Sequence, residues 1–167
     1  MKVFGVTGWK NSGKTTLMER LVTEITARGV SVSTIKHAHH AVDVDQPGKD
    51  SYRHRQAGAQ EVILASSNRW ALMHELRGKA EPALEELLAH IAPVDLVLIE
   101  GYKREDHPKI EAAKSLGERP LLTTKDPKIV AVAAGYDVQN VTVPVLDINT
   151  PAAIATFILK HTGLQTE

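Results

Sequence analysis

Residues 8–15 read GWKNSGKT, which matches the pattern G-x-x-x-x-G-K-T. An apolar, β-rich run over residues 3–7 precedes this pattern, and apolar side chains recur after it at helical spacing as far as Gly29. A strand, a glycine loop and a helix in this order bind phosphate chains, because the loop amides and the helix N-terminus face the anion. The pattern therefore predicts a phosphate-binding loop in an α/β protein.

Each fixed position of this loop has an expected chemical role. Lys14 is expected to reach the β- and γ-phosphates of a nucleotide, and the Thr15 hydroxyl is expected to bind Mg²⁺. A glycine-rich turn before an ordinary helix is the alternative, which the flanking elements disfavour. The predicted nucleotide-binding residues of the loop (a Walker A motif) are Gly8, Asn11, Ser12, Gly13, Lys14, Thr15 and Thr16.

The composition favours a small globular protein, and a cytoplasmic location is expected. The 167 residues suffice for one domain, so we expect a single domain over residues 1–167. The chain has no cysteine, which excludes disulfides and thiolate metal sites. Because the first strand is expected directly after Met1 and Lys2, no signal peptide is expected, and no apolar run is long enough to span a bilayer.

The distribution of charge favours an anionic small molecule over a nucleic acid. The chain is neutral overall, but residues 1–83 carry 12 Lys and Arg against 8 Asp and Glu. This excess of positive charge lies in the half of the chain that contains the phosphate loop, yet it is too small for a nucleic-acid surface. We therefore expect neither a nucleic-acid nor a membrane partner.

Strands and helices alternate along the chain. The near-continuous apolar run over residues 94–99 predicts a strand that is buried on both faces of a parallel sheet. The alternation predicts a P-loop NTPase-like, doubly wound α/β fold with a mainly parallel sheet and helices on both faces. Further strands are expected over residues 30–35, 61–65, 70–74, 129–133 and 141–146, and further helices over 51–57, over 82–91 and from Thr150.

The buried strand ends at Glu100, which is the predicted catalytic residue. Ligands of open α/β sheets bind outside the carboxyl ends of the strands. A carboxylate there is expected to face the Mg²⁺ held by Thr15, or to orient a water for attack on the γ-phosphate. A solvated acid at a strand end is the alternative.

A histidine-rich segment follows the second expected strand and contains Lys36, His37, His39 and His40. Cationic and imidazole N–H groups at a strand end favour recognition of a phosphate or a pterin. Zinc or nickel ligation is a second interpretation, although no cysteine supports it. A solvated strand end is the third.

Residues 43–55 are dense in charged and turn-forming side chains, which is typical of a loop that nucleotide and Mg²⁺ order. Asp43 or Asp45 is expected in the outer shell of the metal, with Asp45 the candidate ligand, and Lys49 or Arg53 is expected to meet a second anion. A solvated connecting loop is the alternative. Asp126 is a candidate for reading the nucleotide base, although its spacing departs from the guanine signature Asn-Lys-x-Asp and leaves ATP open.

The chain resembles the MobB family, the molybdopterin-guanine dinucleotide biosynthesis adapter proteins. The matching motifs include the phosphate loop, Ile35-Lys36-His37-x-His39-His40, Asp43-x-Asp45-x-Pro47-Gly48-Lys49-Asp50-Ser51, Leu98-Ile99-Glu100-Gly101-Tyr102-Lys103 and Leu146-Asp147-Ile148-Asn149. The resemblance implies a GTP-binding homodimer with weak GTPase activity that assists the guanylyltransferase joining GMP to molybdopterin. It also implies that the histidine-rich and Pro-Gly-Lys-Asp segments handle GTP or the pterin phosphate.

Two other functions use the same loop. A small-molecule kinase would need lid arginines that screen the transferred phosphoryl group, and Arg53 with Arg55 is the only close arginine pair in a loop. A metallochaperone GTPase would bind nickel or zinc through His37, His39 and His40.

Overall fold

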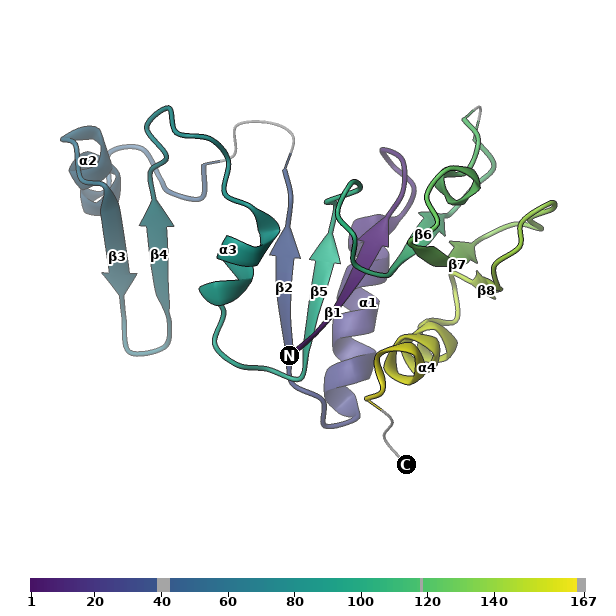
Figure 1. The fold of residues 1–167 in the computed structure, drawn as a ribbon. Helices are drawn as coiled ribbons and strands as arrows, with labels where there is room; N and C mark the ends of the chain where they lie inside the picture. Colours follow the sequence, from purple (N-terminus) through teal and green to yellow (C-terminus); the bar gives the residue numbers. More distant parts are fainter. Residues whose placement is uncertain (39–42, 118, 165–167) are drawn as a thin grey trace. The chain divides into compact units, whose positions relative to one another are not determined.

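The computed structural model describes residues 1–38, 43–117 and 119–164. The chain divides into two compact units (Figure 1). The first comprises Met1–His37 and Ile91–Glu167, and the second comprises Ala38–His90. The second unit is thus inserted between two segments of the first. No helix within the described residues is both long and apolar enough to cross a membrane.

Six parallel strands form the main sheet of the first unit, in the order β2-β5-β1-β6-β7-β8. The strands are β1 (Lys2–Thr7), β2 (Val32–Lys36), β5 (Leu96–Glu100), β6 (Lys109–Ala113), β7 (Ile129–Ala134) and β8 (Val145–Asp147). β5 lies between β1 and β2, and all of its residues are buried. The predicted buried strand of a parallel sheet is therefore confirmed.

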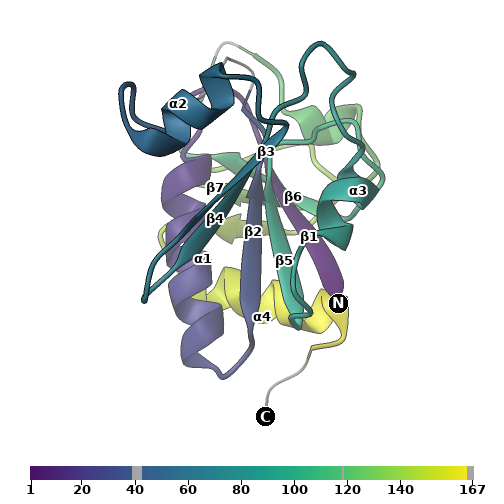
Figure 2. The same ribbon diagram turned by 90° about the vertical axis from the view of Figure 1, so that its left-hand side faces the viewer.

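Two helices, α1 (Lys14–Ala27) and α4 (Pro151–Thr162), pack on one face of this sheet. Figures 1 and 2 show α1 running along the strands. The opposite face of β6 and β7 packs against the 3₁₀ turn η1 (Leu122–Thr124) and nearby loop residues. The large core that α1 and α4 close is built mainly from Phe4, Leu17, Leu21, Ile25, Leu96, Leu98, Ile110, Ile154 and Ile158.

The spacing of apolar residues explains why α1 buries one side. Leu17, Leu21 and Ile25 recur every four residues, so they lie on one face of the helix and are at most 1% exposed. Burying such a side chain contributes about 1.5–3 kcal/mol to the free energy of unfolding. The helix ends before Gly29, whose φ of +80° suits glycine.

Strand β6 was not predicted, and β8 differs from its prediction. β6 is fully buried, but it contains Lys109 and Glu111, so its sequence does not read as an apolar strand. The prediction of a strand over residues 141–146 was wrong in its bounds, since β8 begins only at Val145. Pro144 precedes it and cannot donate a ladder hydrogen bond, although its carbonyl accepts one from Val132 N–H at 2.9 Å.

The second unit contains an antiparallel hairpin and two short helices. The elements are α2 (Asp50–Gln56), β3 (Glu61–Ala65), β4 (Trp70–His74) and α3 (Leu84–Ala89). Both hairpin strands have the predicted bounds, and Ile63 pairs with Leu72. Ile63, Leu72 and Trp70 share one face of the hairpin, and their exposed fractions are 65%, 38% and 68%.

Candidate functional site

The glycine loop joins β1 to α1 at the carboxyl edge of the main sheet. Figure 1 shows this loop beyond the arrowhead of β1, with the arrowheads of β2 and β5 pointing the same way. Gly8 has a φ of +141°, and a Cβ there would lie 2.6 Å from the carbonyl oxygen of Ala112. Gly13, with a φ of +93°, caps α1, which starts at Lys14. The fold thus requires glycine at both fixed positions of the pattern.

The ammonium of Lys14 folds back over the loop. Its Nζ donates a hydrogen bond to the carbonyl of Trp9 at 2.6 Å. Burial lowers the pKa of Lys14, the nearby charges of Lys103 and Lys36 lower it further, and Glu100 opposes them. A bound polyphosphate would supply the negative charge that this group of cations lacks.

Glu100, at the end of β5, contacts both α1 and β2. Thr15 Oγ1 donates a hydrogen bond to Glu100 Oε1 at 3.0 Å, and Lys36 Nζ lies 3.6 Å from the same oxygen. The register explains this meeting, because Lys36 and Glu100 are paired at the ends of β2 and β5. The side chain of Glu100 is only 11% exposed. The structure therefore brings three predicted site residues together at the carboxyl edge.

Thr15 and Glu100 also fit the ligand preferences of Mg²⁺. This ion takes oxygen ligands and is usually held by one or two protein groups together with phosphate oxygens and water. A hydroxyl and a carboxylate 3.0 Å apart provide such a pair. Within the described ranges, no three His, Cys, Asp or Glu side chains are grouped to hold a metal by themselves.

A cavity of about 520 Å³ adjoins the loop and the start of α1. Ser12 lines it, and the buried Ser12 hydroxyl has no hydrogen-bond partner among the described residues. An unpaired buried hydroxyl is costly, which favours a ligand there. The other lining residues are Asn11, Gly13, Lys14, Thr15, Thr16, Leu17, Arg20, Lys114, Ile148 and Asn149.

Several of these lining residues were not predicted. Lys114 follows β6, the strand that was missed, and Lys114 N–H donates to the Ser12 carbonyl at 3.0 Å. Ile148 and Asn149 follow β8, so their position at a strand end was an available signal. Arg20 lies on α1, six residues after Lys14, and no motif marked it.

Two further cations that were not predicted lie over the Trp9 ring of the loop. Lys103 Nζ is 4.8 Å and Arg119 Cζ is 4.9 Å from the ring centroid. The indole N–H of Trp9 donates to the carbonyl of Pro120 at 2.9 Å, which holds this part of the chain beside the loop. The signal for Lys103 was its position three residues after Glu100.

The predicted histidine cluster is described only in part. His37 continues from β2, its N–H donates to the Glu100 carbonyl at 2.9 Å, and its ring stacks on Tyr102 with centroids 4.5 Å apart. Gly101 has a φ of +103°, and a Cβ there would lie 2.9 Å from the Cβ of His37. His39 and His40 lie outside the described residues.

Asp126 precedes β7 and contacts the start of β6, and it does not line the cavity beside the phosphate loop. Its Oδ2 is 3.3 Å from Nζ of Lys109, whose side chain is 1% exposed, and its Oδ1 accepts the Lys128 N–H at 2.9 Å. Asp126 is thus grouped with Lys109, whose ammonium also holds the carbonyl of Lys103, and its role in reading the base stays a prediction.

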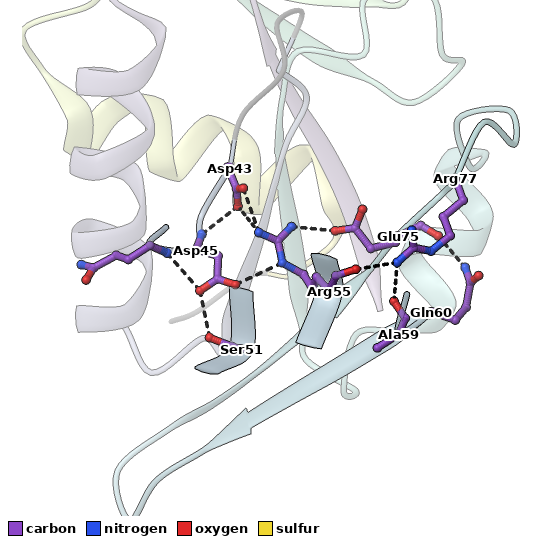
Figure 3. Close-up of polar contacts among 9 residues, drawn as sticks. Asp43, Asp45, Ser51, Arg55, Ala59, Gln60, Glu75 and Arg77 are labelled. Atoms are coloured by element: carbon purple, nitrogen blue, oxygen red, sulfur yellow. Dashed lines mark hydrogen bonds and ion pairs between the residues drawn. The ribbon is translucent and has the colours of Figure 1, made fainter. Parts of the chain in front are cut away.

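In the second unit, three carboxylates surround Arg55 (Figure 3). Its guanidinium contacts Asp43 at 2.8 Å, Asp45 at 3.1 Å and Glu75 at 2.6 Å. Hydrogen bonds to these acids raise the pKa of Arg55, and the same contact lowers the pKa of Asp43. Asp45 also accepts from the Ser51 hydroxyl at 2.9 Å. The described polar contacts of Asp45 thus join the start of the charged segment, residues 43–55, to α2.

Lys49 and Arg53 lie at and within α2. Lys49 is the N-cap residue, and its carbonyl accepts the Arg53 N–H at 2.9 Å. Arg53 Nη1 lies 3.9 Å from Asp50 Oδ1, and both side chains are largely exposed. Together with Asp45, these predicted residues belong to the second unit, whereas Lys14, Lys36 and Glu100 belong to the first.

A parallel sheet with a strand, glycine loop and helix at its carboxyl edge defines the class of this protein. The chain has a P-loop NTPase-like α/β fold, as the sequence predicted. The solved MobB homologue from Bacillus stearothermophilus has this architecture as well. It superimposes with a TM-score of 0.70 at 28% identity, with 99% of this chain and 100% of that one covered.

The chain belongs to the MobB family, described as molybdopterin guanine dinucleotide synthesis protein B, which matches residues 3–135. It is 41% identical to the molybdopterin-guanine dinucleotide biosynthesis adapter protein of Escherichia coli K12 over 155 residues, covering 91% of this chain and 88% of that protein. The protein of the same name from Haemophilus influenzae is 43% identical over 159 residues, with coverages of 93% and 86%. The predicted family is thereby confirmed.

Proposed function

We propose that this chain is a GTP-binding accessory protein of molybdopterin guanine dinucleotide biosynthesis. The observation that carries this proposal is the phosphate loop at the carboxyl edge of the sheet, with Lys14 over it and Thr15 bonded to Glu100. Membership of the MobB family and the printed names of its relatives support the pathway. In this role the protein assists the guanylyltransferase that attaches GMP to molybdopterin.

The nucleotide is held by the loop amides and by charged side chains. Lys14 exchanges its contact with the Trp9 carbonyl for the β- and γ-phosphates. Thr15 and Glu100 would hold Mg²⁺, which neutralises phosphate charge when bound. Lys36 and His37, at the end of β2, are placed to recognise a second anionic group such as the pterin phosphate.

Hydrolysis of GTP is proposed to be slow. Glu100 is already bonded to Thr15 and faces Lys36, so its carboxylate is better placed to hold a metal or orient a water than to move freely as a base. We therefore expect turnover well below the roughly 1–100 s⁻¹ of kinases. A slow GTPase is suited to an adapter, in which the bound nucleotide governs contact with a partner.

Calorimetry with GTP and ATP in the presence of Mg²⁺ tests the nucleotide proposal. We expect wild-type protein to bind GTP more tightly than ATP, and Lys14→Ala to weaken GTP binding by about ten- to a hundredfold through loss of a charge-assisted contact. Lys160→Ala, which removes an exposed lysine from the last turn of α4, is the matched control and should bind as wild type does.

The same samples test the pathway when the guanylyltransferase is added. We expect it to be retained by the immobilised wild-type chain and its product formation to increase. Unchanged GTP affinity in a folded Lys14→Ala variant would refute the role of the loop. Tighter binding of ATP than of GTP would refute guanine specificity, and the absence of any effect on the transferase would refute the adapter role.

A further inference from the structure

Lys103 is a cation of the site that the loop pattern does not include. It follows the end of β5 by three residues and is half-buried, with its Nζ 4.8 Å from the ring centroid of Trp9. Trp9 is itself a loop residue, and its carbonyl accepts the hydrogen bond of Lys14. Lys103 is therefore held beside the part of the loop where Lys14 lies.

The backbone of Lys103 is fixed by a fully buried ammonium. Lys109 Nζ donates to the carbonyl of Lys103 at 3.2 Å and to the carbonyl of Glu105 at 2.5 Å. Asp126 lies 3.3 Å from this ammonium and balances its charge, and the Lys109 side chain is 1% exposed. Burying a charged group requires such compensation. The turn that carries Lys103 is thus anchored on its inner side, while the Lys103 side chain extends to the loop.

The charges around the loop are unbalanced. The charges of Lys36, Lys103 and Glu100 all act on Lys14, and Lys103 also acts on Glu111 of β6, so three cations face two acids. Burial lowers the pKa of Lys14, and the nearby charges of Lys103 and Lys36 lower it further, as expected for like charges held close together. A ligand with several negative charges would relieve that repulsion.

We propose that Lys103 leaves the Trp9 ring and donates a hydrogen bond to the terminal phosphate of a bound nucleoside triphosphate, so that the site distinguishes triphosphate from diphosphate. This inference rests on the proposed binding of GTP. A partly exposed cation–π contact is weaker than a charge-assisted hydrogen bond to phosphate, so the exchange is favourable. Trp9 holds the ammonium close to the loop until the ligand enters, which limits the ordering cost of binding.

The test compares GTP and GDP affinities by calorimetry in Mg²⁺ for wild type, Lys103→Met and Lys103→Arg. Met keeps a long side chain that still packs on Trp9 but removes the charge. We expect Lys103→Met to lose about tenfold or more in GTP affinity, with GDP affinity within about twofold of wild type. Lys103→Arg should restore most of the difference, and Lys160→Met should match wild type for both nucleotides.

Thermal unfolding of each variant confirms that the fold is intact. Equal losses of GTP and GDP affinity in Lys103→Met would overturn this inference, because they would indicate a general field without contact to the terminal phosphate. Unchanged affinities for both nucleotides would overturn it as well. If wild-type protein bound neither nucleotide, the proposed function would fail together with this inference, so the two failures are distinguishable.

Discussion

Glu100 is held by two partners in the candidate site. Its carboxylate lies between a hydroxyl and an ammonium, with Thr15 Oγ1 at 3.0 Å and Lys36 Nζ at 3.6 Å. The three groups come from α1, β2 and β5, so each belongs to a regular element of the main sheet or its helix. A site built on such elements keeps its geometry better than one built on loops alone.

Substitution Glu100→Gln should therefore separate hydrolysis from binding. The amide preserves size but removes the charge that holds the metal or orients water, so we expect the GTPase rate to fall about tenfold or more while GTP affinity changes less. Single-turnover hydrolysis and calorimetry measure the two quantities. Glu19→Gln, on the exposed side of α1, is the control; if Glu100→Gln hydrolysed GTP at the wild-type rate, Glu100 would be a structural acid.

Strand β6 carries a buried polar face that organises the loops beside the site. Lys109 anchors the turn that carries Lys103. Glu111 accepts the N–H groups of Leu122 and Thr123 at 2.8 and 2.9 Å, which fixes η1. Burial raises the pKa of Glu111 despite these hydrogen bonds. The two charged residues of this strand thus support the segments on either side of Trp9.

His107, just before β6, should make the free energy of unfolding depend on pH. Burial and the charge of Lys109 lower its pKa from 6.5 to about 4, with Asp126 opposing. Between these values the unfolded chain binds a proton that the folded chain does not, so acidification favours unfolding. Both ring nitrogens are buried without a hydrogen-bond partner among the described residues. We expect this residue to reduce the free energy of unfolding by at most about 1.4 kcal/mol per pH unit in that interval.

Urea unfolding at several pH values between 4 and 6.5 measures this effect. His107→Gln, which has no titrating ring, should lose less stability than wild type over the interval. His54→Gln, in the exposed part of α2, should follow the wild-type curve. Parallel curves for wild type and His107→Gln would show that the ring is protonated in the folded protein as readily as in the unfolded chain.

The strands predicted from the sequence were those whose apolar residues are not interrupted by charged ones. The hairpin strands are two short apolar runs joined by the polar turn Ser66-Ser67-Asn68, and the β5 segment is a continuous apolar run, so both were predicted. β6 was not predicted because Lys109 and Glu111 interrupt its apolar pattern. Ile110 and Ala112 face the large core, whereas Lys109 and Glu111 are buried on the opposite face, where only tertiary contacts satisfy their charges. Because β6 was not predicted, Lys114, which follows it and lines the cavity, was not predicted either. Lys14 and Thr15 could be predicted from the loop motif, and Glu100 from its position at the end of a buried strand.

At the scale of the whole molecule, the hairpin is the surface that favours a second copy. Ile63, Leu72 and Trp70 expose an apolar face, and β3 and β4 pair only with each other among the described strands. A two-stranded sheet is marginal alone, and an exposed apolar strand invites association. We therefore expect a homodimer, with a mass by light scattering of about twice 18.2 kDa.

A charge on this face should shift the dimer to monomer. We expect Ile63→Lys to raise the dissociation constant by about tenfold or more, because a buried interface disfavours an unpaired ammonium. Leu116→Lys places the same charge at a side chain that is 79% exposed in the first unit, and it should leave the mass unchanged. A monomeric wild type at micromolar concentration, or a dimeric Ile63→Lys, would contradict this assignment of the interface.

The strand order also fixes when the main sheet is able to form during synthesis. β1 and β2 are translated first, yet among the strands that the structure describes β2 pairs only with β5, and β1 only with β5 and β6. Neither early strand has a partner until the ribosome has passed the whole second unit, whose hairpin uses local contacts and is able to close early. The phosphate loop is therefore among the first segments made, but it gains its supporting sheet only after Glu100 has emerged.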